Sequence, residues 1–181
     1  MIHEIVEAIE KELNLYLRIK FAIKESEDKV IVANIMEQDG SVAIKEEDKI
    51  VLSVVNIAKD GHRGGSPAKI RGTNAPVNIS IYLLFAAYFK PDNYKEALRY
   101  ISAVIGYFQK KGTIHPNETP SLPDYVGSLA VELLEPSFDE LSNMWNAIGA
   151  KYVPSVLYRI RSISITDERI RKTSPITGIE V

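Results

Sequence analysis

Apolar residues recur every three or four positions in three stretches of the chain, the spacing of an amphipathic helix. The first stretch covers residues 2–24, where acidic residues come early and basic residues late, as suits the helix dipole. The second covers residues 93–110, and Pro91 and Asp92 are predicted to cap it. Its predicted buried face consists of Tyr94, Ala97, Leu98, Ile101, Val104, Ile105 and Phe108.

The third helix is predicted by a capping box. Ser137 occupies the N-cap position, and Glu140, three residues later, reaches back to the backbone of the cap. The helix runs to about Ile148, where Gly149 is available as a left-handed stop. Trp145 falls at helical spacing with the apolar residues of this stretch, so we expect its ring to lie in the core.

Several stretches have the composition of β-strands: residues 30–35, 50–57, 76–89, 129–133 and 156–165. The stretch 50–57 is apolar almost without interruption, which is typical of a strand covered on both faces. A turn is predicted at residues 38–41, around Gly40.

The last of these strands changes its buried face partway. Apolar residues of its first half share one face and those of its second half lie on the other: Val156, Tyr158 and Ile160, then Ile163 and Ile165. A β-bulge near Arg161 and Ser162 would account for the change. The alternative is that the strand passes from its own core to the surface of a neighbouring molecule.

Taken in order, these elements predict an α/β (α+β) fold in which helices pack on a mixed β-sheet. We predict a single domain over residues 1–165 and an extended C-terminal arm over residues 166–181, because the arm has no core pattern. Two long connections interrupt the domain. Residues 58–75 are rich in glycine, and residues 111–127 contain prolines that argue against regular structure.

Composition favours an ordinary soluble protein. Hydrophobic residues make up 45% and charged residues 25% of the chain, and the formal net charge of -2 gives no general reason to expect nucleic acid or an anionic membrane as a partner. The longest apolar run, residues 81–89, is too short to span a bilayer as a helix. The absence of cysteine and of a signal-peptide pattern agrees with a cytoplasmic protein.

No pattern in the sequence predicts catalytic residues, a metal or a cofactor. The histidines His3, His62 and His115 lie in different segments, whereas a metal site needs convergent ligands. Residues 61–65 could form a nest of backbone amides for an anion, but they lack the Gly-Lys-Ser/Thr ending of a nucleotide-binding loop. We expect this loop to order against a protein partner. An anion-binding transferase or hydrolase using residues 61–71 is the last of the alternatives.

Positive charge is instead local. In the loop 58–75, four basic residues oppose the single acidic residue Asp60. We predict a protein interface formed by basic residues of this loop, the last strand and the arm: Arg63, Lys69, Arg71, Arg159, Arg161, Arg169, Arg171 and Lys172.

Several segments together resemble a known family. They are residues 50–57, 75–89, 94–108, 129–133, 141–145 and 149–161, and the most specific is the Trp145 helix followed by Tyr-x-Pro-Ser-x-x-Tyr at residues 152–158. These segments resemble the cap, or tail terminator, proteins of bacterial contractile injection systems, the phage-tail-like relatives of antifeeding prophages and Photorhabdus virulence cassettes.

The resemblance implies a structural protein rather than an enzyme. It implies a homohexameric ring at the end of the particle opposite the baseplate, where the ring stops polymerisation of the inner tube and anchors the last sheath layer. The implied partners are other copies of the chain and the sheath and inner tube proteins. The alternative among assembly proteins is a tail-completion or connector protein elsewhere in the particle.

Overall fold

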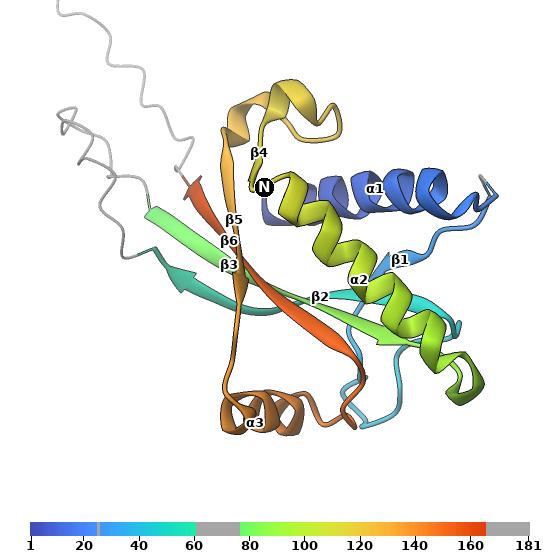
Figure 1. Ribbon diagram of the computed structural model, residues 1–181. Helices are drawn as coiled ribbons and strands as arrows, with labels where there is room; N and C mark the ends of the chain where they lie inside the picture. Colours follow the sequence, from blue (N-terminus) through green and yellow to red (C-terminus); the bar gives the residue numbers. More distant parts are fainter. Residues whose placement is uncertain (25, 61–76, 166–181) are drawn as a thin grey trace, which may run out of the picture.

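The computed structural model describes residues 1–24, 26–60 and 77–165, in which six strands form one sheet in the order β1-β2-β3-β6-β5-β4 (Figure 1). The strands are β1 (Val30–Val32), β2 (Lys49–Lys59), β3 (Val77–Tyr88), β4 (Thr113–Ile114), β5 (Leu129–Leu134) and β6 (Ser155–Ile165). β1 is parallel to β2, and every other neighbouring pair is antiparallel, so the predicted mixed sheet is confirmed.

Three α-helices accompany the sheet in this part of the chain: α1 (Ile2–Phe21), α2 (Tyr94–Lys110) and α3 (Phe138–Ile148). Short 3-10 turns lie at Pro91–Asn93, Pro116–Glu118 and Asp124–Val126. The proline-rich stretch contains the last two turns and the short strand β4. The rest of the stretch, which is most of its length, is irregular, as predicted. The boundary between the domain and an arm at residue 166 stays a prediction, because the description ends there.

Helices lie on both faces of the sheet, but unequally. α1 and α2 lie on one face and α3 on the other (Figure 1). The larger core joins α1 and α2 to residues such as Leu52, Phe85 and Ile160, whereas the smaller core joins Trp145 of α3 to Leu84. Neighbouring residues of β3 thus belong to different cores, which explains the unbroken apolar run in its second half.

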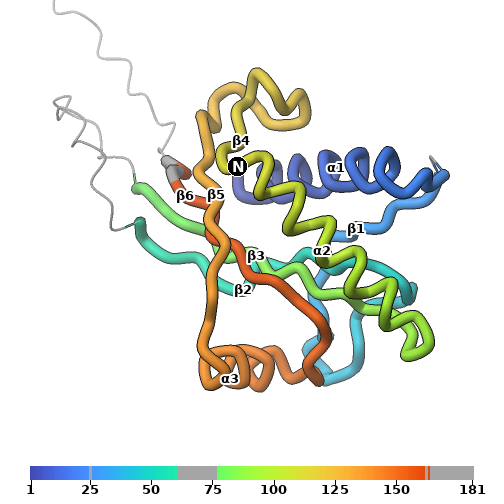
Figure 2. Tube along the Cα trace, viewed as in Figure 1, coloured from blue at the N-terminus to red at the C-terminus, as the bar shows by residue number. Residues whose placement is uncertain are grey.

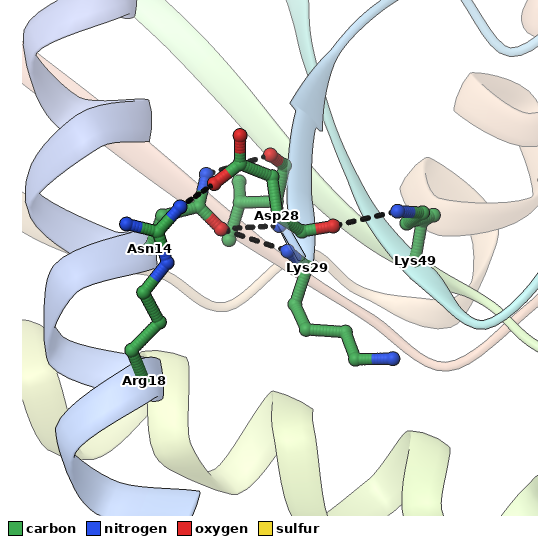
Figure 3. Close-up of polar contacts among 6 residues, drawn as sticks. Asn14, Arg18, Asp28, Lys29 and Lys49 are labelled. Carbon is green, nitrogen blue, oxygen red and sulfur yellow. Dashed lines mark hydrogen bonds and ion pairs between the residues drawn. The ribbon is translucent and has the colours of Figure 1, made fainter. Parts of the chain in front are cut away.

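The outer edge of β1 is closed by side chains of α1 (Figure 3). The buried Asn14 amide accepts hydrogen bonds from the N–H groups of Lys29 and Val30 at 2.8 and 2.9 Å, and donates one to the carbonyl of Val30 at 2.9 Å. One helical turn earlier, the Glu10 carboxylate accepts from the N–H of Val32 at 2.9 Å. The helix therefore satisfies backbone groups that an edge strand would otherwise expose.

The bulge predicted in the last strand is confirmed. Ile79 of β3 pairs with Ile163, whereas Ile81 pairs with Ile160, so β6 contains one extra residue between these pairs. Ile163 is fully buried in the same core as Ile160. The alternative, in which the strand leaves its own core for a neighbouring molecule, is therefore wrong at Ile163.

The third helix also begins and ends as predicted. Both hydrogen bonds of the Ser137–Glu140 capping box are present, and Gly149 adopts a left-handed conformation with φ 78°. Trp145 is buried, with 3% of its surface exposed.

The prediction for the face of α2 is partly wrong. Tyr94 and Leu98 are 55% and 43% exposed, while Tyr100 and Tyr107 lie in the core. The buried face is rotated because the tyrosine rings pack on α1, with Tyr107 against Tyr16 at 5.3 Å between ring centroids.

Asp92 does not cap α2, because it lies within a 3-10 turn that precedes the helix. The carboxylate that contacts this turn is Asp48, which accepts from the Lys90 N–H at 3.1 Å and from the Asn93 side chain at 3.0 Å. These hydrogen bonds outweigh the effect of burial, so the pKa of Asp48 lies below its ordinary value.

Two further elements are shorter than predicted. α1 ends at Phe21, because Ala22 adopts a left-handed conformation with φ 51°. β1 ends at Val32. Beyond it, the carbonyl of Ala33 accepts a hydrogen bond from the Ser53 hydroxyl, so a side chain takes the place of the next backbone donor in the ladder.

We predict that Asn14→Ala lowers the free energy of unfolding by about 2–4 kcal/mol, because it leaves buried backbone groups of Lys29 and Val30 without partners. Chemical denaturation measures the change. Leu15→Ala is the matched control, because Leu15 is the next residue and its side chain is 53% exposed. It should lower the free energy of unfolding by less than about 1 kcal/mol. Equal losses for the two variants would contradict the role given to Asn14.

Candidate interface at the open end of the sheet

Part of the α3-side face of the sheet has no described helix on it. Away from the Trp145 core, one row of paired residues crosses four strands of this face: Asn56, Tyr82, Arg159 and Glu132. Their chain neighbours in β3 and β6, such as Leu83 and Ile160, point into the opposite core. The row therefore presents polar and charged side chains from a surface that the strands hold rigidly.

Arg159 and Glu132 of this row form an ion cluster with Arg161. Arg159 donates two hydrogen bonds to one carboxylate oxygen of Glu132, through Nε at 3.1 Å and through Nη2 at 2.5 Å. The Nε atom of Arg161 lies 3.5 Å from that oxygen. The hydrogen bond from Arg159 to Glu132 is the main cause that raises the arginine's pKa. Among the described residues, two cations share one anion here, and we call Arg159, Arg161 and Glu132 together the cationic row.

The predicted interface residues divide into two groups. Arg159 and Arg161 lie together on this face, each about a quarter exposed and in contact with Glu132. The others lie outside the described residues: Arg63, Lys69, Arg71, Arg169, Arg171 and Lys172.

The segments that carry these other residues start from one end of the sheet (Figure 2). At this end the N–H of Asp60 donates to the carbonyl of Asn78 at 2.9 Å, and Val77 pairs with Ile165. The residues that flank the segments 61–76 and 166–181 (Asp60, Val77 and Ile165) therefore lie side by side, on the side of the bulge where Ile163 lies. We call this region, with Arg159 and Arg161, the open end of the sheet.

The structure adds an exposed aromatic surface that the sequence did not indicate. Phe138 is 89% exposed and Tyr152 is 58% exposed, and both line a hollow of about 610 Å³ over Trp145. The indole N–H of Trp145 is buried and has no hydrogen-bond partner among the described residues. Phe138 follows the N-cap Ser137 directly, so its place on the helix could be predicted, but its exposure depends on what surrounds it.

Two of the three histidines lie in the described residues, on different elements. His115 Nδ1 lies 2.8 Å from the Ser128 hydroxyl, His3 lies on α1, and His62 falls outside the description. Within residues 1–24, 26–60 and 77–165, no group of three His, Cys, Asp or Glu side chains could hold a metal ion. No helix in the same ranges is long and apolar enough to cross a membrane.

These features define a mixed-sheet α/β domain with a cationic surface at one end of the sheet. The model of the Pvc16 N-terminal domain family matches residues 4–178, so the chain belongs to this family. A search of curated proteins found no significant match.

Two solved structures have a similar fold. One is the cryo-EM structure of the sheath/tube terminator of PVC, an extracellular contractile injection system, in its extended state: the TM-score is 0.61 at 17% identity, over 100% of this chain and 62% of that chain. The other is the cap that terminates the tube of the anti-feeding prophage: the TM-score is 0.52 at 17% identity, over 93% and 58%. The chain spans about three fifths of the length of these two structures.

A double-mutant cycle tests the ion cluster. For Arg159→Ala and Glu132→Ala we expect a coupling energy of about 0.5–1 kcal/mol, because the pair is hydrogen-bonded but partly exposed. The control cycle between Arg161 and Glu132 should give less, because its 3.5 Å contact is longer. The measurement is the free energy of unfolding of each variant. A larger coupling for Arg161 than for Arg159 would contradict the geometry.

Proposed function

We propose that the chain is the terminator domain of a contractile injection system, which caps the end of the particle opposite the baseplate. In this role it ends the inner tube and anchors the last sheath layer. The observation that carries the proposal is its membership of the Pvc16 N-terminal domain family. The fold likeness to a sheath/tube terminator and to a tube-terminating cap supports it.

We propose further that the working form is a homohexameric ring, assembled in the cytoplasm, whose partners are the sheath and inner tube proteins. A protein that acts by binding its neighbours needs side chains that are exposed on a fixed surface. The cationic row on the open end of the sheet meets this need, since strands fix its position and no described helix lies over it. The non-enzymatic role is supported by the structural character of the two similar proteins.

The cationic row is suited to an acidic partner surface. Within the part of the chain that the structure describes, Arg159 and Arg161 share one carboxylate, so their guanidinium groups retain capacity for a second one. Such contacts set the register and the rate of assembly more than its strength. We propose that this row contacts a carboxylate-bearing surface of a neighbour in the particle.

Deletion of the gene tests the proposed function. Without a terminator, nothing stops addition of tube subunits, so we expect tails of uncontrolled length in electron micrographs. Complementation with the wild-type gene should restore uniform length, and complementation with the control variant Leu15→Ala should do so as well. Tails of normal, uniform length in the deletion strain would contradict the proposal.

A further inference from the structure

The outer edge of β2 is covered over only half of its length. β1 pairs with β2 at residues Ile50 to Leu52, and no described residue pairs with this edge between Val54 and Lys59. This contrasts with β1, whose outer edge is closed by Asn14 and Glu10. An uncovered stretch of edge strand can accept another strand.

The antiparallel ladder shows which groups of β2 face outward. The N–H of Asp60 donates to Asn78 of β3. Hydrogen-bonded pairs alternate along such a ladder, so Ala58 also bonds to β3 while Ile57 and Lys59 direct their N–H and C=O groups away from it. Ile57 is 52% exposed. These two residues offer backbone donors and acceptors to an incoming strand.

A hollow lies beside this edge on each face of the sheet. On the α1 side, a hollow of about 740 Å³ is lined by Val32 and Val54 together with the charged side chains of Glu7, Glu10 and Lys11. On the α3 side, a hollow of about 440 Å³ is lined mainly by apolar groups, among them Met36, Val55, Met144 and Ile148. Successive side chains of an added strand would enter the two hollows in turn.

The two hollows differ in charge. The α1 side contains two carboxylates and one lysine, Lys11, and burial raises the pKa of Glu10, so an added cation there would relieve the cost of its charge. The α3 side suits an aliphatic side chain. A fitting strand therefore alternates basic and apolar residues. The sequence beyond β6 does so at Arg169, Ile170 and Arg171.

The position of Ile165 favours a neighbouring molecule as the source of this strand. Ile165 pairs with Val77 at the open end of the sheet, two strands away from the outer edge of β2. To reach its own edge, the chain would have to cross the connection between β2 and β3 at the same end of the sheet. Connections in proteins avoid crossing in this way.

We propose that residues 166–181 of one copy add as a strand to the outer edge of β2, residues 54–59, in a second copy. In this arrangement Arg169 and Arg171 face Glu7 and Glu10, and Ile170 enters the apolar hollow on the α3 side. Because the donor and acceptor are different surfaces, the contact is head-to-tail and can close a ring. This inference rests on the proposed ring and assigns the contact that holds it together.

A mixing experiment tests the proposal. The acceptor variant is Ile57→Pro, which removes an outward N–H and leaves the ladder with β3 intact. The donor variant ends at Ile165. Each variant alone should be monomeric, and an equal mixture should give dimers and nothing larger, because only one contact per pair can form. Mass photometry measures all three, and wild type should form the ring.

Matched controls separate folding from assembly. Ile57→Thr keeps both the N–H and a β-branched side chain, so it should still form the ring. Circular dichroism reports whether Ile57→Pro is folded, and Lys59→Pro, which also removes an outward N–H, repeats the test at a second position.

A charge exchange tests the register. Glu7→Lys and Arg171→Glu should each weaken the contact about tenfold, and the two together should restore it to within about threefold. If each single substitution weakens the contact but the two together do not restore it, the assigned register is overturned.

The outcomes distinguish this inference from the proposed function. If Ile57→Pro and the truncated chain still form rings, or if their mixture stays monomeric, strand addition is overturned while the terminator role stands. If wild-type protein forms no ring either alone or on tubes, both are overturned.

Discussion

The described helices cover more of one face of the sheet than of the other, and the rest of the structure depends on this inequality. β3 lies at the centre of it, with Phe85 packed against Phe108 and Tyr158 on the α1–α2 side. On the other side, Leu84 and Ala86 meet Trp145 near α3. Further along β3, Tyr82 meets Arg159 instead, and the surface becomes polar. One strand therefore supplies both the core and the candidate interface.

The outer edges of β1 and β2 are also covered unequally. α1 lies close enough to β1 for Asn14 and Glu10 to take the place of a further strand. β1 is short, however, and it ends at Val32. The protection of the sheet edge therefore stops there, before the second half of β2. A protein that must add to identical copies in a defined way needs such an edge in one place and closed edges elsewhere. The geometry is consistent with controlled addition rather than aggregation.

Much of the fold could be predicted from local patterns. The capping box at Ser137, the stop at Gly149 and the bulge near Arg161 all depend on residues close together in the sequence, and all three are confirmed. The face of α2 was harder, because Tyr100 and Tyr107 are buried by contacts with α1 and not by their own spacing.

The interface residues stay a prediction, and the sequence did not show the geometry in which the described ones lie. Basic residues of the last strand were expected at an interface, and Arg159 and Arg161 do lie on an open face. That Glu132 pairs with both depends on the register of β5 against β6, which no local pattern reveals. Nor does any local pattern show that Asn14 closes a strand edge, or that β2 extends beyond β1, since both depend on which strands become neighbours.

We propose that this domain forms the ring at the end of an injection particle opposite the baseplate. The most direct measurement is cryo-electron microscopy of intact particles whose copy of this chain carries a visible label. We expect six-fold density from the label at the end opposite the baseplate, in contact with both tube and sheath. Label at the baseplate, along the sheath, or absent from purified particles would contradict it.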